Sequence, residues 1–489
     1  MPIGRVNSSW GGTRIEPWIS RDAFENSSCS EEFELIKLAE APDFEEQIAA
    51  RQRQYQKDLT EWVELFYSCG NEAAGNWKNC DYDDSGWNSV SVETRFPEIG
   101  VEWFRKTVEL PESWAGKEVT LNLGAVDDLD ETYFNGVKVG SISIDNPIYW
   151  KANRSYKIPA GTVKAGSNTI AVRVGNIAGA GGFVTTDKLF MQCGSEKIAI
   201  GGNWKHKKEF TADPVKLGER PRLKAVDRDS HQFPTNLYNS MVKPWTVYPM
   251  RGFIWYQGCS NAGVAKDSQD ARNYMALHPL LIQGWRDAWN DQEMPFILTQ
   301  LAGYQYGSPY KPFTEKYLRS IPPKKDRFAE IREVQGAMLN MPLTGMASAI
   351  DIGDHSDIHP ANKQDLAYRM AQEAKRLAYG YKGITSGPMF KAMKVEGNKI
   401  RIEYTNIGSG LEVRNGKLGS FAIAGKDGKF VWANAELDGN TVVVWADSVS
   451  EPVHVRYAWA GFPLDTNLYN KEGFPACPFR TDAPDYLLK

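Results

Sequence analysis

Residues 252–263 read Gly-Phe-Ile-Trp-Tyr-Gln-Gly-Cys-Ser-Asn-Ala-Gly, an apolar run that passes abruptly into small and polar residues. The run at residues 253–256 has the length and composition of a buried β-strand. A tight polar turn follows at residues 257–261. Open α/β sheets bind ligands beyond the carboxyl ends of their strands. We therefore expect this turn to border a binding site, where Asn261 can offer its side-chain NH2 to an oxyanion.

Two further stretches of the chain carry sequence motifs that are relevant to this turn. Residues 7–18 read Asn-Ser-Ser-Trp-Gly-Gly-Thr-Arg-Ile-Glu-Pro-Trp, and residues 351–360 read Asp-Ile-Gly-Asp-His-Ser-Asp-Ile-His-Pro. In this order, the three stretches resemble signature blocks of the SGNH-type esterases, and in particular of the sialate O-acetylesterase family. The resemblance implies that residues 7–18 supply an oxyanion-hole N–H from a glycine. It also implies that residues 351–360 carry the catalytic histidine.

His359 is the candidate general base of such an enzyme. A histidine can accept a proton near neutral pH and return it to the leaving alkoxide. The orienting carboxylate is expected from Asp357, which fits the Asp-x-His-Pro phrase of the family, with Asp354 as a second candidate. A carboxylate that accepts a hydrogen bond from the imidazole selects the tautomer of the ring and stabilises the imidazolium. We expect His355 to face solvent.

The oxyanion hole is expected from Gly11 and Asn261, with Gly12 as an alternative to Gly11. A glycine lets its backbone N–H approach a ligand closely, and an asparagine adds a side-chain donor. Cys259 stands where the family usually has a glutamate, in the phrase Gln-Gly-Glu-Ser-Asn. The resemblance therefore gives Cys259 a supporting place and not that of the nucleophile.

The nucleophilic serine of the family is expected to be missing from this sequence. In the family it lies in a block close to Gly-Gln-Ser-Asn, upstream of the Ser-Trp-Gly-Gly segment, which begins here at Ser9. We expect the polypeptide by itself to be inactive or poorly stable, because neighbouring strands would lose a hydrogen-bonded partner. The family gives none of Ser8, Ser9 and Ser260 the attacking role. A misassigned start and a split enzyme, whose serine arrives on a second polypeptide, are the alternatives.

Hydrophobic patterning predicts alternating strands and helices in two parts of the chain. Such alternation favours a parallel sheet covered on both faces. Residues 43–67 contain no Gly or Pro and predict a long helix. The other predicted elements are strands at residues 3–7, 253–256, 295–301 and 345–350, helices at residues 271–290 and 362–379, and a helical run from Ile331.

Residues 71–206 differ in composition, being rich in Gly, Asn, Asp, Thr and Val. Asn135-Gly136 is a strong signal for a two-residue hairpin turn. The phrases Tyr-Asp-Asp-Ser-Gly-Trp at residues 82–87 and Trp-Phe-Arg-Lys at residues 103–106 resemble the galactose-binding-like jelly-roll module found beside many glycosidases. Such modules bind sugars or brace a neighbouring domain.

The expected fold is α/β, with an SGNH-type, flavodoxin-like parallel-sheet hydrolase domain in two parts, residues 1–70 and 207–386. A β jelly-roll is inserted at residues 71–206, and a C-terminal β domain follows at residues 387–489.

Composition excludes several classes of protein. Hydrophobic residues at 42% exclude a disordered chain, and a net charge of −4 gives no basic surface for nucleic acid.

No apolar run is long enough for a membrane span, and no signal peptide is visible; we expect the intact protein to be periplasmic or secreted. The 16 tryptophans suit core packing or stacking on sugar rings. Six cysteines without a Cys-x-x-Cys pair argue against structural zinc, and we expect no metal or organic cofactor.

These expectations combine into a carbohydrate O-acetylesterase that releases acetate through Ser-His-Asp chemistry. Acetylated sialic acid is the expected substrate, with acetylated xylan as its rival. The alternative from another class is a non-catalytic carbohydrate-binding protein that uses the jelly-roll module. The sequence carries no signal for an oligomeric state.

Overall fold

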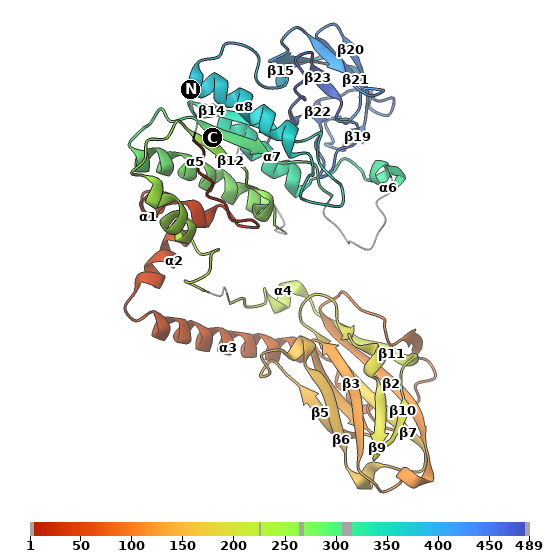
Figure 1. Cartoon of the computed structure of the whole chain (residues 1–489). Helices are drawn as coiled ribbons and strands as arrows, with labels where there is room; N and C mark the ends of the chain where they lie inside the picture. Colours follow the sequence, from red (N-terminus) through yellow and green to blue (C-terminus); the bar gives the residue numbers. More distant parts are fainter. Residues whose placement is uncertain (1–3, 224–225, 264–267, 306–314, 485–489) are drawn as a thin grey trace. The chain divides into compact units, whose positions relative to one another are not determined.

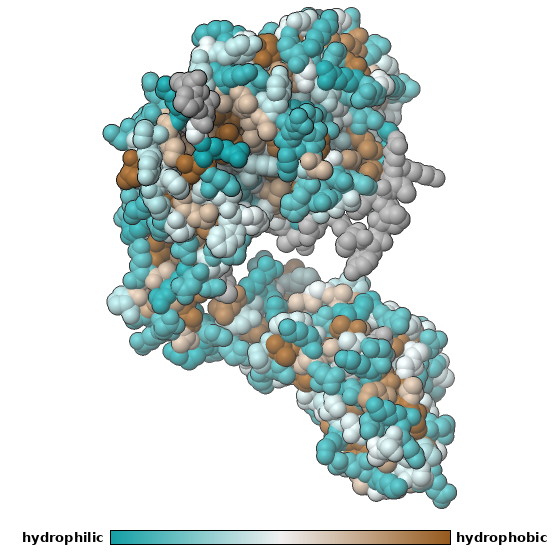
Figure 2. Space-filling view, viewed as in Figure 1, coloured by the Kyte–Doolittle hydropathy of each residue, from teal (hydrophilic) through white to brown (hydrophobic). Residues whose placement is uncertain are grey.

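The chain is divided into two units, each with its own hydrophobic clusters. The computed structural model describes residues 4–223, 226–263, 268–305 and 315–484 (Figure 1). The split unit comprises Met1–Phe44 and Val226–Lys489, and the inserted unit comprises Glu45–Ala225. On the face in view, hydrophobic residues are scattered singly among hydrophilic ones over both units (Figure 2).

The split unit is built on three parallel strands in the order β12-β13-β14. Successive side chains of a strand point to opposite faces of a sheet. Phe296 and Leu298 of β13 join the core that contains α5 and α7, whereas Ile297 packs with Leu366 of α8. The elements are β12 (Phe253–Trp255), β13 (Phe296–Gln300), β14 (Thr344–Ser348), α1 (Arg21–Glu25), α2 (Ser30–Glu40), α5 (Gln269–Trp289), α6 (Glu315–Ser320), α7 (Arg327–Ala337) and α8 (Lys363–Tyr379).

The predicted helices at residues 271–290 and 362–379 are confirmed as α5 and α8, with ends that differ by at most two residues. Two strand predictions need correction. Within the described residues, β12 pairs with β13 alone, and Ile254 is 56% exposed, so β12 is an edge strand and not a buried one. Residues 4–7 form no strand, because a strand requires a hydrogen-bonded neighbour and the structure shows none for this segment.

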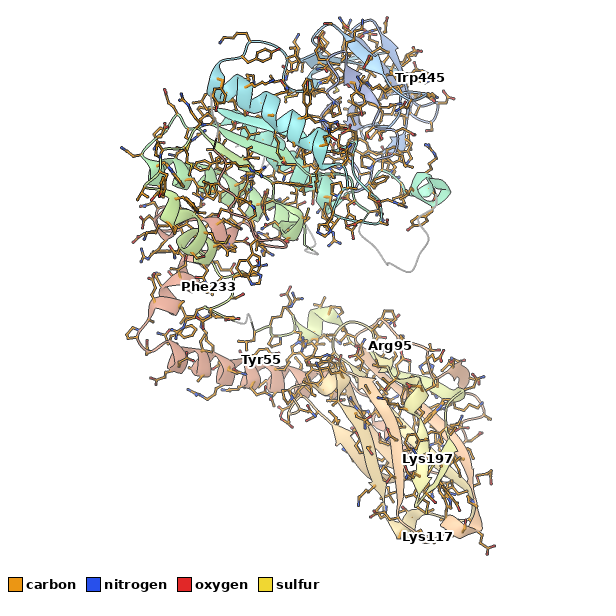
Figure 3. All side chains as sticks on the ribbon, in the orientation of Figure 1. Tyr55, Arg95, Lys117, Lys197, Phe233 and Trp445 are labelled. Carbon is orange, nitrogen blue, oxygen red and sulfur yellow. The ribbon has the colours of Figure 1, made fainter. Side chains whose placement is uncertain are left out.

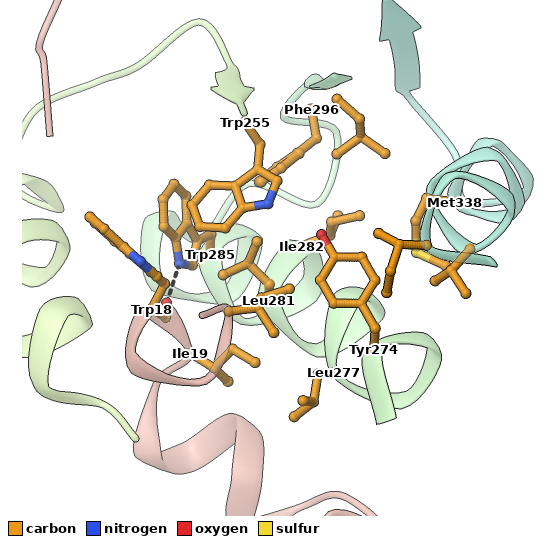
Figure 4. Packing of buried hydrophobic residues seen from close by; sticks show 14 of the residues in the cluster. Trp18, Ile19, Trp255, Tyr274, Leu277, Leu281, Ile282, Trp285, Phe296 and Met338 are labelled. Carbon is orange, nitrogen blue, oxygen red and sulfur yellow. Dashed lines mark hydrogen bonds between the residues drawn. The ribbon is translucent and has the colours of Figure 1, made fainter. Parts of the chain in front are cut away.

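Aromatic side chains join the amino-terminal segment of the split unit to its sheet (Figure 4). The Trp285 indole N–H of α5 donates to the Trp18 carbonyl at 2.9 Å. Trp255 of β12 lies edge-on to both rings, with centroid separations of 5.8 Å to Trp18 and 5.6 Å to Trp285. Edge-to-face aromatic pairs are stabilising beyond the area that they bury. This packing holds residues 15–19 beside the strand that leads into the polar turn.

The carboxyl-terminal part of the split unit is β structure around its own hydrophobic cluster, in which Ile350 takes part. Trp445, labelled in Figure 3, ends one of its central strands. Its strands are β15 (Met389–Glu396), β16 (Lys399–Thr405), β17 (Leu411–Val413), β18 (Phe421–Ala424), β19 (Val431–Trp432), β20 (Asn434–Asp438), β21 (Thr441–Trp445), β22 (His454–Tyr457), β23 (Leu468–Asn470) and β24 (Phe479–Arg480). Residues 387–489, expected as a separate domain, thus belong to the same unit as the parallel sheet.

The inserted unit contains two antiparallel sheets, with strand orders β1-β11-β2-β7-β4-β5 and β10-β9-β3-β6. The predicted hairpin is confirmed between β4 and β5, where Asn135 and Gly136 have φ values of 47° and 83°. Such a turn requires positive φ at both central residues. The strands are β1 (Asn88–Ser91), β2 (Gly100–Leu110), β3 (Val119–Asp127), β4 (Leu129–Phe134), β5 (Val137–Ile142), β6 (Asn153–Ile158), β7 (Gly166–Asn176), β8 (Gly182–Phe183), β9 (Phe190–Cys193), β10 (Glu196–Ala199) and β11 (Asn203–Thr211).

Both boundaries of the inserted unit differ from the expected 71–206. The predicted long helix is confirmed as α3 (Phe44–Ser68); from Glu45 onward it belongs to the inserted unit, and its second half packs with the β strands. Trp62 and Phe66 share a cluster with residues of β2, β4 and β7. At the other end, Leu217 of α4 (Pro214–Leu217) joins the same cluster. Compositional change marked where the strands begin, but the helix supplies part of their core.

The packing of α3 predicts a strong effect of Phe66→Ala on the stability of the inserted unit. The side chain is fully buried and its ring lies 5.3 Å from that of Phe210. We expect the free energy of unfolding to fall by about 3–5 kcal/mol, measured by urea denaturation. Leu65→Ala is the matched control, since Leu65 is 45% exposed and should change stability by about 0.5 kcal/mol or less. Equal effects of the two variants would contradict this packing.

Candidate functional site

The turn after β12 requires a glycine for two reasons. Gly258 has a φ of +142°, and a Cβ there would lie 2.8 Å from Nε2 of Gln335. The chain then makes a short 3₁₀ turn over Cys259–Asn261 and buries the Asn261 side chain, which is 1% exposed. The sequence motif thus produces a sharp reversal that turns an asparagine inward.

The Asn261 amide connects this turn to residues 15 and 16. Its Oδ1 accepts the Ile15 N–H at 2.9 Å and a Gln257 side-chain N–H at 2.7 Å. Its Nδ2 donates to Oε2 of Glu16 at 3.1 Å. One donor of the predicted oxyanion residue is therefore engaged by a carboxylate, and Asn261 joins two segments that lie 245 residues apart.

Gln257 extends the network to two helices. Its side-chain NH2 also donates to the Thr13 carbonyl at 3.0 Å, and its Oε1 accepts the Tyr274 hydroxyl of α5 at 3.1 Å. Gln335 of α7 donates to the Gln257 carbonyl at 2.9 Å. Burial raises the pKa of Tyr274, so its hydroxyl stays protonated and able to donate.

The loop with Gly11 lies against the same turn. The Gly12 carbonyl accepts the Ser260 hydroxyl at 2.9 Å and a Gln232 side-chain N–H at 3.0 Å. Gly12 has a φ of +74°, and neither Gly11 nor Gly12 has a described atom within 4 Å of an added Cβ. The structure therefore brings the Gly11 loop and the Asn261 turn together and leaves open space beside both Gly11 and Gly12.

The loop with His359 begins at an anchored aspartate. The Asp351 carboxylate accepts two hydrogen bonds from the Arg369 guanidinium of α8, at 2.6 and 2.8 Å. It also accepts the Tyr469 hydroxyl at 2.7 Å. A bidentate guanidinium–carboxylate pair fixes direction as well as distance. The loop that follows β14 is thus held by α8 and by a residue of β23.

Asp357 lies against His359 in this loop. Nδ1 of the imidazole is 3.0 Å from Oδ1 of Asp357, which also accepts the His359 backbone N–H at 2.8 Å. These hydrogen bonds lower the pKa of the Asp357 carboxyl, and the bond from the His359 backbone N–H has the largest effect. Asp354 instead accepts the backbone N–H and hydroxyl of Ser356, which lower its pKa to about 2, and contacts the ring of His355.

The His359 side chain is 83% exposed, so its ring is open to a substrate. The start of α8 meets the end of β12, where Nζ of Lys363 lies 3.4 Å from the Tyr256 hydroxyl oxygen. Ile358 and Cys259 both pack against the same hydrophobic cluster. The His359 loop and the polar turn therefore lie at one edge of the sheet, beyond the carboxyl ends of its strands.

Cys259 has the properties of a supporting residue. Burial raises the pKa of its thiol to about 11, so the thiolate is a minor form near neutral pH. All six cysteines are free thiols. Within the ranges that the structure describes, no group of three His, Cys, Asp or Glu side chains could hold a metal ion. No helix in those ranges is long and apolar enough to cross a membrane.

The chain is similar to carbohydrate esterases. Residues 223–376 match the carbohydrate esterase family described as sialic acid-specific acetylesterase. The sialate O-acetylesterase of Mus musculus is 29% identical over 270 residues, which cover 50% of this chain and 46% of that protein. The sialate O-acetylesterase of Homo sapiens is 28% identical over 291 residues, which cover 53% of this chain and 51% of that protein. The chain thus spans about half the length of the curated relatives it matches.

A solved structure, that of a carbohydrate acetylesterase from Xanthomonas citri, is 26% identical to the chain. It covers 77% of this chain and 99% of its own, with a TM-score of 0.47.

The hydrogen bonds of Asn261 predict that Asn261→Asp destabilises the folded chain and that a second substitution, at Glu16, restores stability. The new oxygen would face Oε2 of Glu16, and we expect the free energy of unfolding to fall by about 2–4 kcal/mol in urea denaturation. The double variant Glu16→Gln, Asn261→Asp places an amide donor opposite the new carboxylate and should recover most of that loss. A double variant as unstable as Asn261→Asp would contradict the pairing.

The raised pKa of Cys259 predicts slow alkylation by iodoacetamide near neutral pH. Between pH 7.5 and 9.5 its rate should rise about tenfold per unit, because only the thiolate reacts. Peptide mass spectrometry can follow Cys259 and the exposed Cys80 in one sample, and Cys80 should be labelled first. Fast labelling of Cys259 at pH 7 would show an activated thiolate and return it to consideration as the nucleophile.

Proposed function

We propose that this protein removes O-acetyl groups from sugars, because residues 223–376 match the carbohydrate esterase family described as sialic acid-specific acetylesterase. The observation that carries the proposal is the contact of His359 Nδ1 with Asp357 at 3.0 Å, on a ring that is 83% exposed at the edge of the sheet. A hydrolase of unactivated esters needs such a base, held in one tautomer and open to its substrate.

In the proposed reaction, Nε2 of His359 accepts a proton from a serine hydroxyl as its oxygen bonds to the acetyl carbonyl carbon. Asp357 accepts the Nδ1–H and stabilises the imidazolium. In this scheme the negative carbonyl oxygen accepts the Gly11 N–H and the second N–H of the Asn261 amide, the one that does not donate to Glu16. The imidazolium then protonates the sugar oxygen as the ester bond breaks. In the second half of the reaction, His359 accepts a proton from water as the water oxygen bonds to the acetyl carbon, and the imidazolium returns that proton to the serine oxygen as acetate leaves.

The serine of this scheme is not supplied by the hydroxyls nearest to the two turns. Ser8 donates to the Met241 carbonyl at 2.7 Å, Ser9 to the Asn7 side chain at 2.6 Å, and Ser260 to the Gly12 carbonyl at 2.9 Å. A nucleophilic hydroxyl must instead give its proton to the base. These hydrogen bonds support the expectation that none of the three hydroxyls is the nucleophile, and a split enzyme, whose serine arrives on a second polypeptide, is one alternative to be tested.

We propose acetylated sialic acid as the substrate, since the matched family and the curated relatives carry that specificity in their descriptions. Acetylated xylan is the second candidate. A non-catalytic sugar-binding protein is the alternative from another class, and it predicts saturable sugar binding that does not depend on His359. A periplasmic or secreted location accords with substrates of this kind.

Acetate release from O-acetylated sialic acid and from acetylated xylan tests the proposal. If the chain is active, His359→Ala should lower kcat about 10²–10⁴-fold, because the general base is lost. His355→Ala is the matched control, four residues earlier in the same loop, and should keep most of the activity. Equal loss in both variants would contradict the assignment. A folded but inactive wild-type chain would place the nucleophile elsewhere, and activity on adding a partner polypeptide would identify the split enzyme.

Asp357→Asn and Asp354→Asn separate the two carboxylates. We expect Asp357→Asn to lower kcat by about 10²-fold or more, because an amide can no longer hold the imidazolium. Asp354→Asn should affect kcat less, since Asp354 contacts the neighbouring His355. A steady-state comparison of the two variants checks this order, and the reverse order would make Asp354 the orienting residue.

A further inference from the structure

Trp10 is the most exposed of the 16 tryptophans, with 51% of its side chain open, and it lies directly beside Gly11. Its indole stacks on the imidazole of His231, with ring centroids 5.0 Å apart and an interplanar angle of 9°. Since the imidazole covers part of one face, the open half of the indole leaves apolar surface available to a ligand. An exposed aromatic ring of this size carries a hydrophobic cost unless something covers it.

Hydrogen bonds hold this stacked pair in place. The Trp10 carbonyl accepts the Thr13 hydroxyl at 2.9 Å. Gln232, which follows His231 directly, accepts the Arg14 N–H at 3.0 Å and donates to the Gly12 carbonyl at 3.0 Å. Both sides of the stack are therefore tied to one loop. Because the rings are already ordered, a ligand that packs on them loses little conformational entropy of the protein.

The same hydrogen bonds set the position of the rings relative to the proposed chemistry. Gly12 also accepts the Ser260 hydroxyl at 2.9 Å, so the loop with Trp10 is tied to the Asn261 turn. Trp10 is one residue from Gly11, whose N–H we assign to the oxyanion hole. A group bonded to the reacting acetyl would thus lie within reach of the indole.

We propose that Trp10, stacked on His231, is the platform on which the pyranose ring of the acetylated sugar packs. A pyranose presents C–H groups on its faces and hydroxyls at its rim, which suits an aromatic ring bordered by polar groups. Polar groups border the stack on the His231 side, where Nε2 of Gln232 lies 3.4 Å from Nε2 of the imidazole. The inference deepens the proposed function and rests on it for the identity of the sugar, and it makes Trp10 a determinant of sugar affinity.

Binding of sugars without an ester tests the platform separately from catalysis. Wild-type chain with ¹⁵N-labelled tryptophan is titrated with N-acetylneuraminic acid and, separately, with xylotetraose, while the indole N–H signals are followed by NMR. The Trp10 signal, identified by its loss in Trp10→Phe, should shift saturably with one of the two sugars. Absence of saturable binding of either sugar would overturn the proposal.

Variants then locate the binding surface. Trp10→Ala should weaken sugar binding about tenfold or more, and Trp10→Phe should weaken it less. His231→Ala should weaken it about threefold to tenfold, and His231→Phe, which keeps a stacking ring, should restore much of the affinity. Trp150→Ala is the matched control, because Trp150 is 42% exposed but lies in the inserted unit. Unchanged melting temperatures would show that each variant is folded.

The outcomes distinguish the platform from the proposed activity. Unchanged affinity in Trp10→Ala would overturn the platform. A loss confined to Trp150→Ala would also overturn it and would place sugar binding on the inserted unit. Affinity lost with Trp10, in a chain that releases no acetate, would support the platform while contradicting esterase activity of this chain by itself.

Discussion

The side-chain amide of Asn261 is the contact on which the rest of the split unit depends. It is buried and makes three hydrogen bonds, of 2.7 to 3.1 Å, to Ile15, Glu16 and Gln257. A buried polar group left without its partner costs about 1–3 kcal/mol, so these bonds must form together. Through them a segment near residue 15 is fixed against a turn near residue 260, and Trp10 and Gly11 are positioned as a consequence.

Arginine side chains join α7 to the carboxyl-terminal part of the split unit. Arg332 of α7 donates to the Ala302 carbonyl at 3.1 Å and to the Gly461 carbonyl at 3.3 Å, which connects β13 with the carboxyl-terminal strands. Burial lowers the pKa of Arg332 to about 10, so it keeps its charge at neutral pH. Arg480 of β24 pairs with Glu333 of α7 at 2.7 Å. The carboxyl-terminal part of the split unit is therefore fixed against α7, which packs on the parallel sheet.

Sequence patterns located the helices and the hairpin, which depend on local residue types. They did not predict strand pairing or burial, which depend on neighbouring segments. Helix α3 was predictable from a long stretch without Gly or Pro, and the β4–β5 hairpin from Asn135-Gly136. The strand expected at residues 3–7 does not form over its described residues 4–7, because extended propensity does not supply a neighbouring strand. Ile254 was expected to be buried, because an apolar run does not reveal which strand lies at a sheet edge. Glu16 stood inside a quoted motif, yet only its contact with Asn261 shows its purpose.

By itself, the sequence determined the order of helices and strands in each part, since these depend on local residue type and spacing. The candidate residues His359, Asp357, Gly11 and Asn261 followed from the resemblance of three sequence motifs to those of an esterase family. The tertiary structure alone decided that Asp357 and not Asp354 contacts His359, that α3 belongs with the inserted strands, and that Trp10 stacks on His231. Those outcomes depend on contacts between residues distant in the chain or on the exact curvature of a loop, and spacing along a sequence does not encode either.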